Sequence, residues 1–444
     1  MKIIIAGSGE VGTHLAKMLS NEDQDIIVLD SNQQQLDALD AHYNLMTYNG
    51  STSSFSTMTE LGMSSTDLYI AVTPYESRNI TSCAIAKKLG ARKTVARIDN
   101  YEFLIKKNKD ILKNLGVDYL IYPENLAAEE IHLSLSHNWA RYWGELNEGK
   151  LLMIGVKLHA GTPLIDLQLK DLPVSNHDFH VAAIKRRNET IIPTGQDKLL
   201  ADDIVYFITT PEHVEKVREL SGKKKKVIKK AFIFGGSRVA IRFALQFHEE
   251  YQIKIVDNDR EHCEHMATLL PDCEIIYGDG RDIEVLRENN IYQYDAFLAL
   301  TGSSETNILS CLTAKEFGIN KTVADVEDLQ FFSQAENLNI GTAINKKLLA
   351  SSHIFKILLA SDESNSKFLT LADAEIAEMQ AKEGSKITKK LVKDLKLPYG
   401  MTLAALVRGD DCELISGMTQ IQAGDYVVVF CLTGMFRKME KWFG

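Results

Sequence analysis

A repeat of about half the chain length is the feature that most restricts what this sequence can fold into. Residues 79–96 and residues 307–324 are identical at eleven of eighteen positions, at a constant offset of 228. A second set of positions recurs at an offset of 222, namely Ala182, Ala183, Arg186, Gly195 and Asp203 as Ala404, Ala405, Arg408, Gly417 and Asp425. Solenoid repeats are much shorter, about 20–50 residues. The order A1–B1–A2–B2 therefore predicts two tandem copies of a two-domain unit.

Composition places the chain among globular proteins and narrows its partners. Of its 444 residues 45% are hydrophobic and 25% are charged, which is typical of a soluble globular protein. A net charge of −10 argues against nucleic-acid binding. No apolar run approaches the ~18–20 residues of a membrane span, and the opening MKIIIAGSGE is unlike a signal peptide. We expect a cytoplasmic protein, whose six cysteines, with no CxxC pair, are reduced.

Each A segment alternates apolar strands with helical patterns. In the first copy the sequence predicts helices at 11–19, 33–39 and 77–89, between the strands KIIIAG, DIIVLD, DLYIAVT and KTVARI. Strands separated by helices of this length indicate right-handed βαβ crossovers. The fold class is therefore α/β, with a parallel sheet in each A domain.

Each B segment has short strands separated by turn residues, as at 151–158, 180–185 and 204–208. Asp202-Asp203 and Gly424-Asp425 predict hairpin turns before a last strand. A small α+β domain is the expected structure of each B segment.

A nucleotide-binding loop is predicted after the first strand of A1. Gly7-Ser8-Gly9-Glu10-Val11-Gly12 is a GxGxxG motif between a strand and a helix, where free N–H groups of the helix N-terminus can bind phosphate. Asp30 ends the second strand, where a carboxylate can accept hydrogen bonds from ribose hydroxyls. Because neither Arg nor Lys follows in Ser31-Asn32, the sequence favours NAD or another adenine nucleotide over NADP.

Further positions complete the predicted first site. Asn49-Gly50-Ser51 follows the third strand, where the adenine would lie, and Thr73 ends the fourth. Arg97 ends the fifth strand and is a candidate phosphate ligand. The alternative for Arg97 is an ion pair with Asp99 or Glu102.

The second copy keeps some of these features and loses others. Its loop reads Gly235-Gly236-Ser237-Arg238-Val239-Ala240, so serine and alanine replace the second and third glycines. The ribose acid and the turn after the third strand are kept, and the candidate residues there are Asp257, Asp279 and Thr301. Asp325 stands at the position of Arg97, where a carboxylate would repel phosphate. The second site is therefore either a working nucleotide site or a structural relic.

Other chemical motifs favour structural interpretations. Glu261-His262-Cys263-Glu264-His265 has two histidines at i and i+3, but the sequence offers no partner cluster, so no metal site is predicted. Trp139 and Trp143 are predicted to share one face of a helix, as core or as a hinge contact. Lys223–Lys226 is interpreted as a solvated linker, with an electrostatic contact as the alternative.

The whole chain resembles the TrkA family, the regulatory subunits of bacterial Trk potassium uptake systems. The segments that carry the resemblance include MKIIIAGSGEVG, LYIAVTPYESRNI and YPENLAAEEI in the first unit, and IIYGDG, FLALTGSSETNI and IQAGDYVVVF in the second. The resemblance implies two tandem RCK units, each a Rossmann-like N-domain followed by a small C-domain. The corresponding bounds are 1–123 (N-domain), 124–142 (connecting helix), 143–224 (C-domain), 229–347 (N-domain) and 366–444 (C-domain).

The resemblance also implies a function. Family members bind NAD(H) or ATP/ADP through their N-domains and gate a membrane potassium-translocating, TrkH-like subunit, to which they attach at the cytoplasmic face. They form homo-oligomeric rings, here expected to be tetramers. Nucleotide contacts would fall on Gly7–Val11, Asp30, Asn49–Ser51, Thr73 and Arg97. The Asn49-Gly50 turn, in place of Gly-Asp, departs from the family pattern.

The leading hypothesis is thus a non-catalytic regulator that senses nucleotide and controls potassium transport. A soluble NAD-dependent dehydrogenase with a duplicated core is the first alternative, although the sequence offers no proton donor for it. An adaptor whose bound nucleotide is purely structural is the second.

Overall fold

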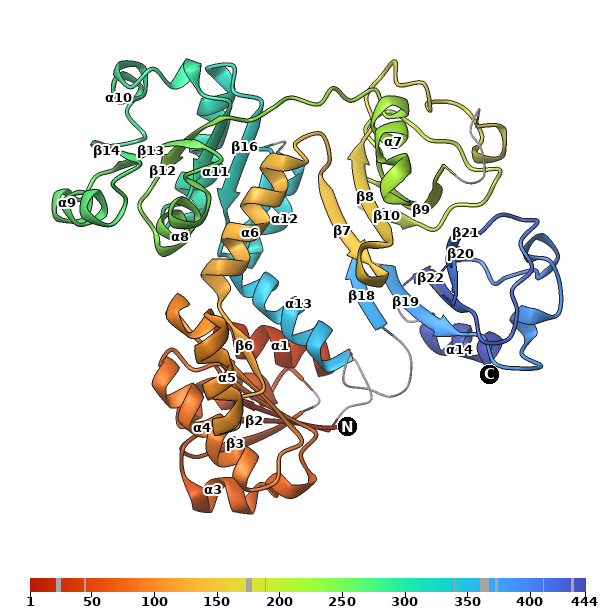
Figure 1. The fold of residues 1–444 in the computed structure, drawn as a ribbon, viewed down its shortest axis with the longest axis horizontal. Coiled ribbons are helices and arrows are strands. Elements are labelled where there is room, and N and C mark those ends of the chain that lie inside the picture. The colour runs from red at the N-terminus through yellow and green to blue at the C-terminus, as the bar shows by residue number, and fades with distance from the viewer. Residues whose placement is uncertain are drawn as a thin grey trace. The chain divides into compact units, whose positions relative to one another are not determined.

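The computed structural model describes residues 1–20, 25–43, 45–172, 178–187, 189–338, 340–359, 367–371, 374–409, 411–432 and 435–444. By its internal contacts the chain divides into two units, each built from two separate stretches of sequence. Unit 1 comprises residues 1–132 and 228–358, and unit 2 comprises residues 133–227 and 359–444. Unit 1 therefore contains both A domains, and unit 2 contains both B domains (Figure 1).

The first N-domain is a six-stranded parallel sheet in the order β3-β2-β1-β4-β5-β6. Its strands are β1 (Lys2–Ala6), β2 (Asp25–Asp30), β3 (Met46–Asn49), β4 (Leu68–Ala71), β5 (Lys93–Arg97) and β6 (Tyr119–Ile121). Its helices are α1 (Glu10–Ser20), α2 (Gln33–Asp40), α3 (Phe55–Glu60), α4 (Glu76–Lys88), α5 (Lys106–Leu115) and α6 (Pro123–Ser136). The helices predicted at 11–19, 33–39 and 77–89 are thus confirmed within about a residue of their ends.

The second N-domain repeats this sheet in the order β14-β13-β12-β15-β16-β17. Its strands are β12 (Lys230–Phe234), β13 (Gln252–Asp257), β14 (Glu274–Tyr277), β15 (Ala296–Ala299), β16 (Lys321–Asp325) and β17 (Thr342–Ile344). Its helices are α8 (Arg238–Phe247), α9 (Arg260–Leu269), α10 (Ile283–Glu288), α11 (Ser304–Glu316), α12 (Leu329–Asn337) and α13 (Lys346–Leu359). The order reverses between β1 and β4, and between β12 and β15, which is where ligands bind in open parallel sheets.

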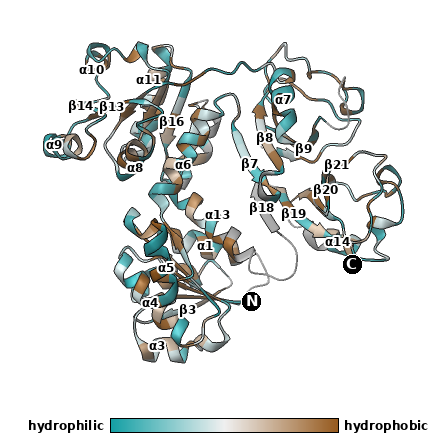
Figure 2. Ribbon diagram, viewed as in Figure 1, coloured by the Kyte–Doolittle hydropathy of each residue, from teal (hydrophilic) through white to brown (hydrophobic). Residues whose placement is uncertain are grey.

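The apolar runs of the sequence form the centres of both parallel sheets. Ile3, Ile4 and Ile5 of β1 are completely buried, and so are Phe232 and Ile233 of β12. Strands buried on both faces read as continuous apolar runs because helices cover both sides of a parallel sheet. Figure 2 shows the hydrophobic colour within the two parallel sheets and the hydrophilic colour on the outer helix α9.

Both C-domains are five-stranded sheets in which every strand pair is antiparallel. The first has the order β10-β9-β11-β8-β7, from β7 (Tyr142–Leu146), β8 (Leu151–Lys157), β9 (His180–Arg186), β10 (Glu189–Ile191) and β11 (Ile204–Thr209), with α7 (Val214–Leu220). The second has the order β18-β19-β22-β20-β21, from β18 (Lys367–Leu371), β19 (Ala374–Gln380), β20 (Met401–Arg408), β21 (Asp411–Leu414) and β22 (Tyr426–Leu432), with α14 (Phe436–Phe443).

The residues that repeat at an offset of 222 hold each C-domain together and join the two. Arg186 donates two hydrogen bonds to the buried carboxylate of Asp203, at 2.8 and 2.7 Å, and Arg408 binds Asp425 at the same two distances. The alanine pairs 182–183 and 404–405 lie in one hydrophobic cluster that both C-domains share. Small side chains at these positions allow the two sheets to approach closely.

Three details of the predicted secondary structure were wrong. Trp139 and Trp143 do not share a helix face, because α6 ends at Ser136 rather than continuing to residue 142, and Trp143 lies in β7. The two rings still meet edge to face at 6.2 Å. The turns before β11 and β22 are not hairpins either. β11 follows β10 in the chain but pairs with β9 and β8, and β22 follows β21 but pairs with β19 and β20.

The lysine run was interpreted correctly as a linker. It lies between α7 and β12, outside any helix or strand, and Lys224–Lys226 are exposed. Lys223 is half-buried, and burial lowers its pKa to about 8.

Candidate functional site

The glycines of the first loop meet different steric demands. Gly7 has φ of +117°, and a Cβ there would lie 3.0 Å from the backbone of Thr73. A Cβ on Gly12 would lie 1.9 Å from the carbonyl oxygen of Gly7. Around Gly9 no described atom lies within 4 Å of the corresponding point. The first and third glycines are therefore required by the fold, whereas the second leaves open space in front of the α1 N-terminus.

Asp30 is fixed in its ionised form beside this loop. Its carboxylate accepts hydrogen bonds from the backbone N–H of Ser8 at 2.6 Å and of Asn32 at 2.9 Å. Burial alone raises the pKa of Asp30, but these backbone donors outweigh it and hold the pKa below its usual value. Asp257 binds the N–H groups of Gly236 and Asp259 in the same way, at 2.7 and 2.8 Å.

Asn79 joins the ends of β4 and β5, and sequence reasoning overlooked it. Its amide N–H₂ donates to the carbonyl oxygens of Thr73 and Arg97, both at 2.9 Å, and its oxygen accepts from the N–H and hydroxyl of Thr73. Asn307 makes the same four contacts to Thr301 and Asp325. The signal was present, because these asparagines are the first residues of the repeated eighteen-residue segment.

The remaining predicted residues of the first site lie along the same edge of the sheet. Thr73 is buried directly after β4, and Arg97 is half-exposed at the end of β5. Asn49, the last residue of β3, and Ser51 shortly after it are exposed, and the N–H of Gly50 donates to the carbonyl oxygen of Asp30. Glu10 is exposed at the first residue of α1, and Val11 is buried in the core.

Asp99, one alternative partner of Arg97, is paired with a residue of the other N-domain. The Nη2 of Arg238 lies 3.0 Å from a carboxylate oxygen of Asp99 and donates to its carbonyl oxygen at 3.2 Å. The sequence predicts Arg238 to belong to the second nucleotide loop, but its side chain instead contacts Asp99, just after the end of β5.

The second copy contains a cavity of about 480 Å³ at the predicted place. It is lined by five residues predicted from the sequence, Gly235, Gly236, Ser237, Asp257 and Thr301. Three others lie elsewhere: Arg238 faces the first N-domain, Val239 is in the core, and Asp279 binds Arg281 at 2.7 Å. His262 also lines the cavity, whereas His265 is exposed. Among the residues that the structure describes, no three His, Cys, Asp or Glu side chains form a potential metal site.

The second loop differs from the first in how its helix begins. Ser237 is the N-cap of α8, and its hydroxyl accepts from the N–H of Ala240. Ala240 corresponds to Gly12 of the first loop, where a Cβ would collide with the carbonyl oxygen of Gly7. The backbones of the two loops therefore differ at this point.

Asp325 is buried at the end of β16, and burial raises its pKa to about 7. Its Oδ1 has no hydrogen-bond partner among the described atoms. At neutral pH the group is therefore partly protonated, and it repels an anion less than an ordinary aspartate would.

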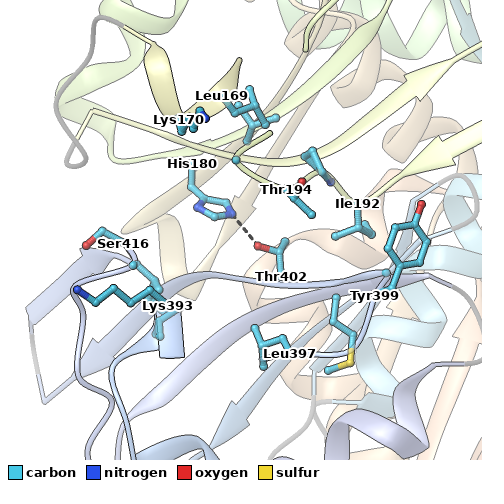
Figure 3. A pocket seen from close by; sticks show the side chains of 18 of the residues that line it. Leu169, Lys170, His180, Ile192, Thr194, Lys393, Leu397, Tyr399, Thr402 and Ser416 are labelled. Atoms are coloured by element: carbon cyan, nitrogen blue, oxygen red, sulfur yellow. Dashed lines mark hydrogen bonds between the residues drawn. The ribbon is translucent and has the colours of Figure 1, made fainter. Parts of the chain in front are cut away.

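A second cavity, of about 520 Å³, lies between the two C-domains. His180 and Thr402, which correspond at the offset of 222, meet there, with Nε2 3.1 Å from the hydroxyl oxygen (Figure 3). Burial lowers the pKa of His180 to about 4, so the ring is neutral at physiological pH. Lys170 and Lys393 line the same cavity. No motif in the sequence predicts this cavity.

Family comparison agrees with this architecture. The TrkA-N domain matches residues 3–123 and 231–346, and the TrkA-C domain matches residues 153–222 and 376–444. The chain belongs to the TrkA family. The Trk system potassium uptake protein TrkA of Vibrio alginolyticus is 31% identical over 438 residues, which cover 97% of this chain and 95% of that relative. The protein of the same name from Haemophilus influenzae is 30% identical, with 97% and 95% covered.

Solved structures support the RCK fold of this TrkA-family chain. The GsuK RCK domain has a TM-score of 0.62 at 14% identity, covering 100% of this chain and 94% of its own. The GsuK channel bound to NAD has a TM-score of 0.63 at 14% identity, with 100% and 78% covered. The predicted tandem RCK architecture is therefore confirmed. Within the described residues, no helix of this chain has both the length and the apolar character of a membrane span.

Proposed function

We propose that this chain is a nucleotide-sensing regulatory subunit of a potassium uptake system. In this role the first N-domain binds NAD(H), or ATP and ADP, and the C-domains and α6 convey the bound state to an integral-membrane potassium-translocating partner, TrkH-like in type. The protein acts at the cytoplasmic face of the membrane as a homo-oligomeric ring, which we expect to be a tetramer.

The ionised carboxylate of Asp30 beside the open space at Gly9 is the observation that carries this proposal. A nucleotide in that space would place its ribose hydroxyls at Asp30 and its phosphates at the N-terminus of α1, where helix N–H groups favour an anion. Arg97 lies at the same edge of the sheet and adds a cation for the phosphates. GsuK structures bound to NAD and to ADP support both ligand classes.

Regulation requires that nucleotide bind one arrangement of the subunit more tightly than another. The side chain of Asn79 is hydrogen-bonded to the backbone of both Thr73 and Arg97. A movement of Thr73 after β4 is therefore coupled through Asn79 to Arg97 at the end of β5. Nucleotide bound at these strand ends can in this way alter the packing of the N-domain.

Calorimetric titration of the whole protein with NADH and, separately, with ATP tests the proposal. We expect saturable binding, no loss of NADH absorbance during incubation, and at least tenfold weaker binding for Asp30→Asn and Arg97→Ala, which is at least about 1.4 kcal/mol. Asp257→Asn is the matched control, because it alters the equivalent residue of the second copy and leaves the first site intact. Wild-type affinity in both first-site variants would show that the site is misplaced, and steady NADH consumption would favour a dehydrogenase.

Gly9→Ala separates ligand binding from folding. Because an added Cβ meets open space, we expect the thermal unfolding midpoint to stay within about 1 °C of wild type, while nucleotide affinity falls at least fivefold. Differential scanning fluorimetry and the same titration measure the two effects. Unchanged affinity at unchanged stability would mean that phosphate does not approach the loop at Gly9.

A further inference from the structure

The two N-domains meet each other through residues at corresponding positions. At the offset of 228, Glu10 at the start of α1 corresponds to Arg238 at the start of α8, and Asp99 corresponds to Glu327. Arg97 pairs with Ile121 in the first sheet, and Asp325 pairs with Ile344 in the second. Glu124 and Lys347, each three residues further on, therefore also correspond.

A first charge cluster consists of Arg238 from the second N-domain with Asp99 and Glu124 from the first. Arg238 contacts Asp99 at 3.0 Å. Burial lowers the pKa of Arg238, but the hydrogen bond to Asp99 and the negative charges of Glu124 and Asp99 outweigh it and raise that pKa above its usual value. Glu124 is only 2% exposed. Asp99 of one domain thus contacts a cation of the other, and the charge of Glu124 acts on the same cation.

A second charge cluster consists of Glu10 from the first N-domain with Lys347 and Glu327 from the second. Lys347 forms an ion pair with Glu10 across the boundary and another with Glu327 at 3.1 Å. The side chain of Lys347 is 14% exposed. Lys346 also forms an ion pair with Glu327, so this cluster has two acids and two cations, and only Lys347 reaches across the boundary.

The two clusters differ in which element supplies the cation. In the first cluster the cation is on the nucleotide loop of the second N-domain and the matching helix carries an acid. In the second cluster the loop carries the acid, and the cation is on helix α13. At the loop position the charge is positive in the second N-domain (Arg238) and negative in the first (Glu10). At the helix position it is negative in the first N-domain (Glu124) and positive in the second (Lys347).

We propose that this charge reversal selects pairing between a first and a second N-domain and disfavours pairing of two identical N-domains. In a pair of first N-domains, Glu10 of each copy would face Asp99 and Glu124 of the other, so three acids would meet and only Arg97, which acts on Asp99, would oppose them. In a pair of second N-domains, Arg238 would face Lys347. Charged groups at an interface exclude wrong partners mainly by such repulsion.

Burial makes the repulsion effective. An exposed ion pair contributes little to stability, and the side chain of Glu10 is 72% exposed. Glu124 and Lys347 are nearly buried, however, and an unmatched charge at a buried position is strongly unfavourable. The surrounding contacts are specific too: Arg242 stacks 3.5 Å above the ring of Tyr101 and donates to Asn125 at 2.9 Å.

The test compares the natural full-length chain with an equalised variant, Glu10→Arg/Lys347→Glu. In this variant both N-domains carry a cation on the loop and an acid on the helix, so identical domains also become complementary. Tyr101→Cys/Arg242→Cys reports pairing within a chain, because these residues touch. Tyr101→Cys/His14→Cys reports pairing of two first N-domains between chains, because His14 corresponds to Arg242 at the offset of 228. A short bismaleimide links each pair, and the chain without added cysteines gives the background.

In the natural chain we expect the reporter within the chain to react and the reporter between chains to stay at background. In the equalised variant we expect the first reaction to persist and the second to rise at least fivefold. The natural chain and the equalised variant have the same covalent linker between their N-domains. The effective concentration that the linker creates is therefore equal in both and cannot explain a difference in cross-linking. Lys347→Glu alone, which places three acids together and leaves only Lys346 to oppose them, should lower the yield within the chain at least threefold. Equal products between chains in both backgrounds, or no rise in the equalised variant at wild-type stability, would overturn the proposal.

Discussion

Asp203→Ala is expected to destabilise the first C-domain by about 2–4 kcal/mol, because it removes the buried, charged acceptor of three hydrogen bonds while its partner Arg186 keeps 33% of its side-chain surface in contact with water. Asp203 is 1% exposed and accepts two hydrogen bonds from Arg186 and a third, at 2.8 Å, from the N–H of Leu200. The substitution therefore removes the group that fixes the turn before β11 to the end of β9.

Tryptophan fluorescence during urea unfolding measures this effect selectively. All three tryptophans of the chain, Trp139, Trp143 and Trp442, lie in unit 2, so their emission reports on the C-domains. The neighbouring variant Asp202→Asn is the control, because it removes only an ion pair between the largely exposed Asp202 and Lys157. That change should cost less than about 1 kcal/mol. A loss below about 1 kcal/mol for Asp203→Ala would contradict the role assigned to the buried pair.

Asp325→Asn is expected to stabilise unit 1 by an amount that grows with pH. Burial raises the pKa of Asp325 from its ordinary value of 3.8 to about 7, despite the opposing charges of Lys346 and Lys347. Between pH 4 and 7 the folded chain therefore binds a proton that the unfolded chain has released, and folding stability falls as the pH rises through this range. Three pKa units correspond to about 4 kcal/mol, which is the largest gain that asparagine can give at pH 8.

Calorimetric unfolding at pH 5, 6, 7 and 8 measures that difference. The midpoint of the variant minus that of wild type should increase from pH 5 to pH 7 and level off toward pH 8, because Asp325 titrates near pH 7 and asparagine does not titrate. Asp279→Asn is a suitable control, since this acid is also in the second N-domain but is exposed and paired with Arg281. A constant difference between pH 5 and pH 8 would show that Asp325 is ionised throughout.

The sequence was most informative where one residue type alone satisfies the backbone. Gly7 and Gly12 identified the strand–loop–helix junction because a Cβ would collide there, and the uninterrupted isoleucines of β1 identified a strand buried on both faces. Spacing was misleading for Trp139 and Trp143. An i, i+4 pair fits a helix face, but it fits a helix end followed by an edge strand equally well.

Local patterns in the sequence do not predict contacts between residues of different domains. Arg238 looked like a residue of its own loop, and only the packing of two sheets places it against Asp99, 139 positions away in the chain. The raised pKa of Asp325 likewise follows from burial, which the repeat does not encode. Asn79 could have been found by asking why a polar residue opens the best-matched segment of the repeat.

The division of the chain into two discontinuous units has a consequence for how it can be taken apart. The polypeptide passes from one unit to the other three times, within α6, at residues 227–228 and within α13 (Figure 1). A single cut at any one crossing, including the exposed lysines beside Val227, leaves two covalent bridges intact. The two units are therefore joined by three covalent connections. Separating the two units therefore requires the chain to be cleaved at all three crossings.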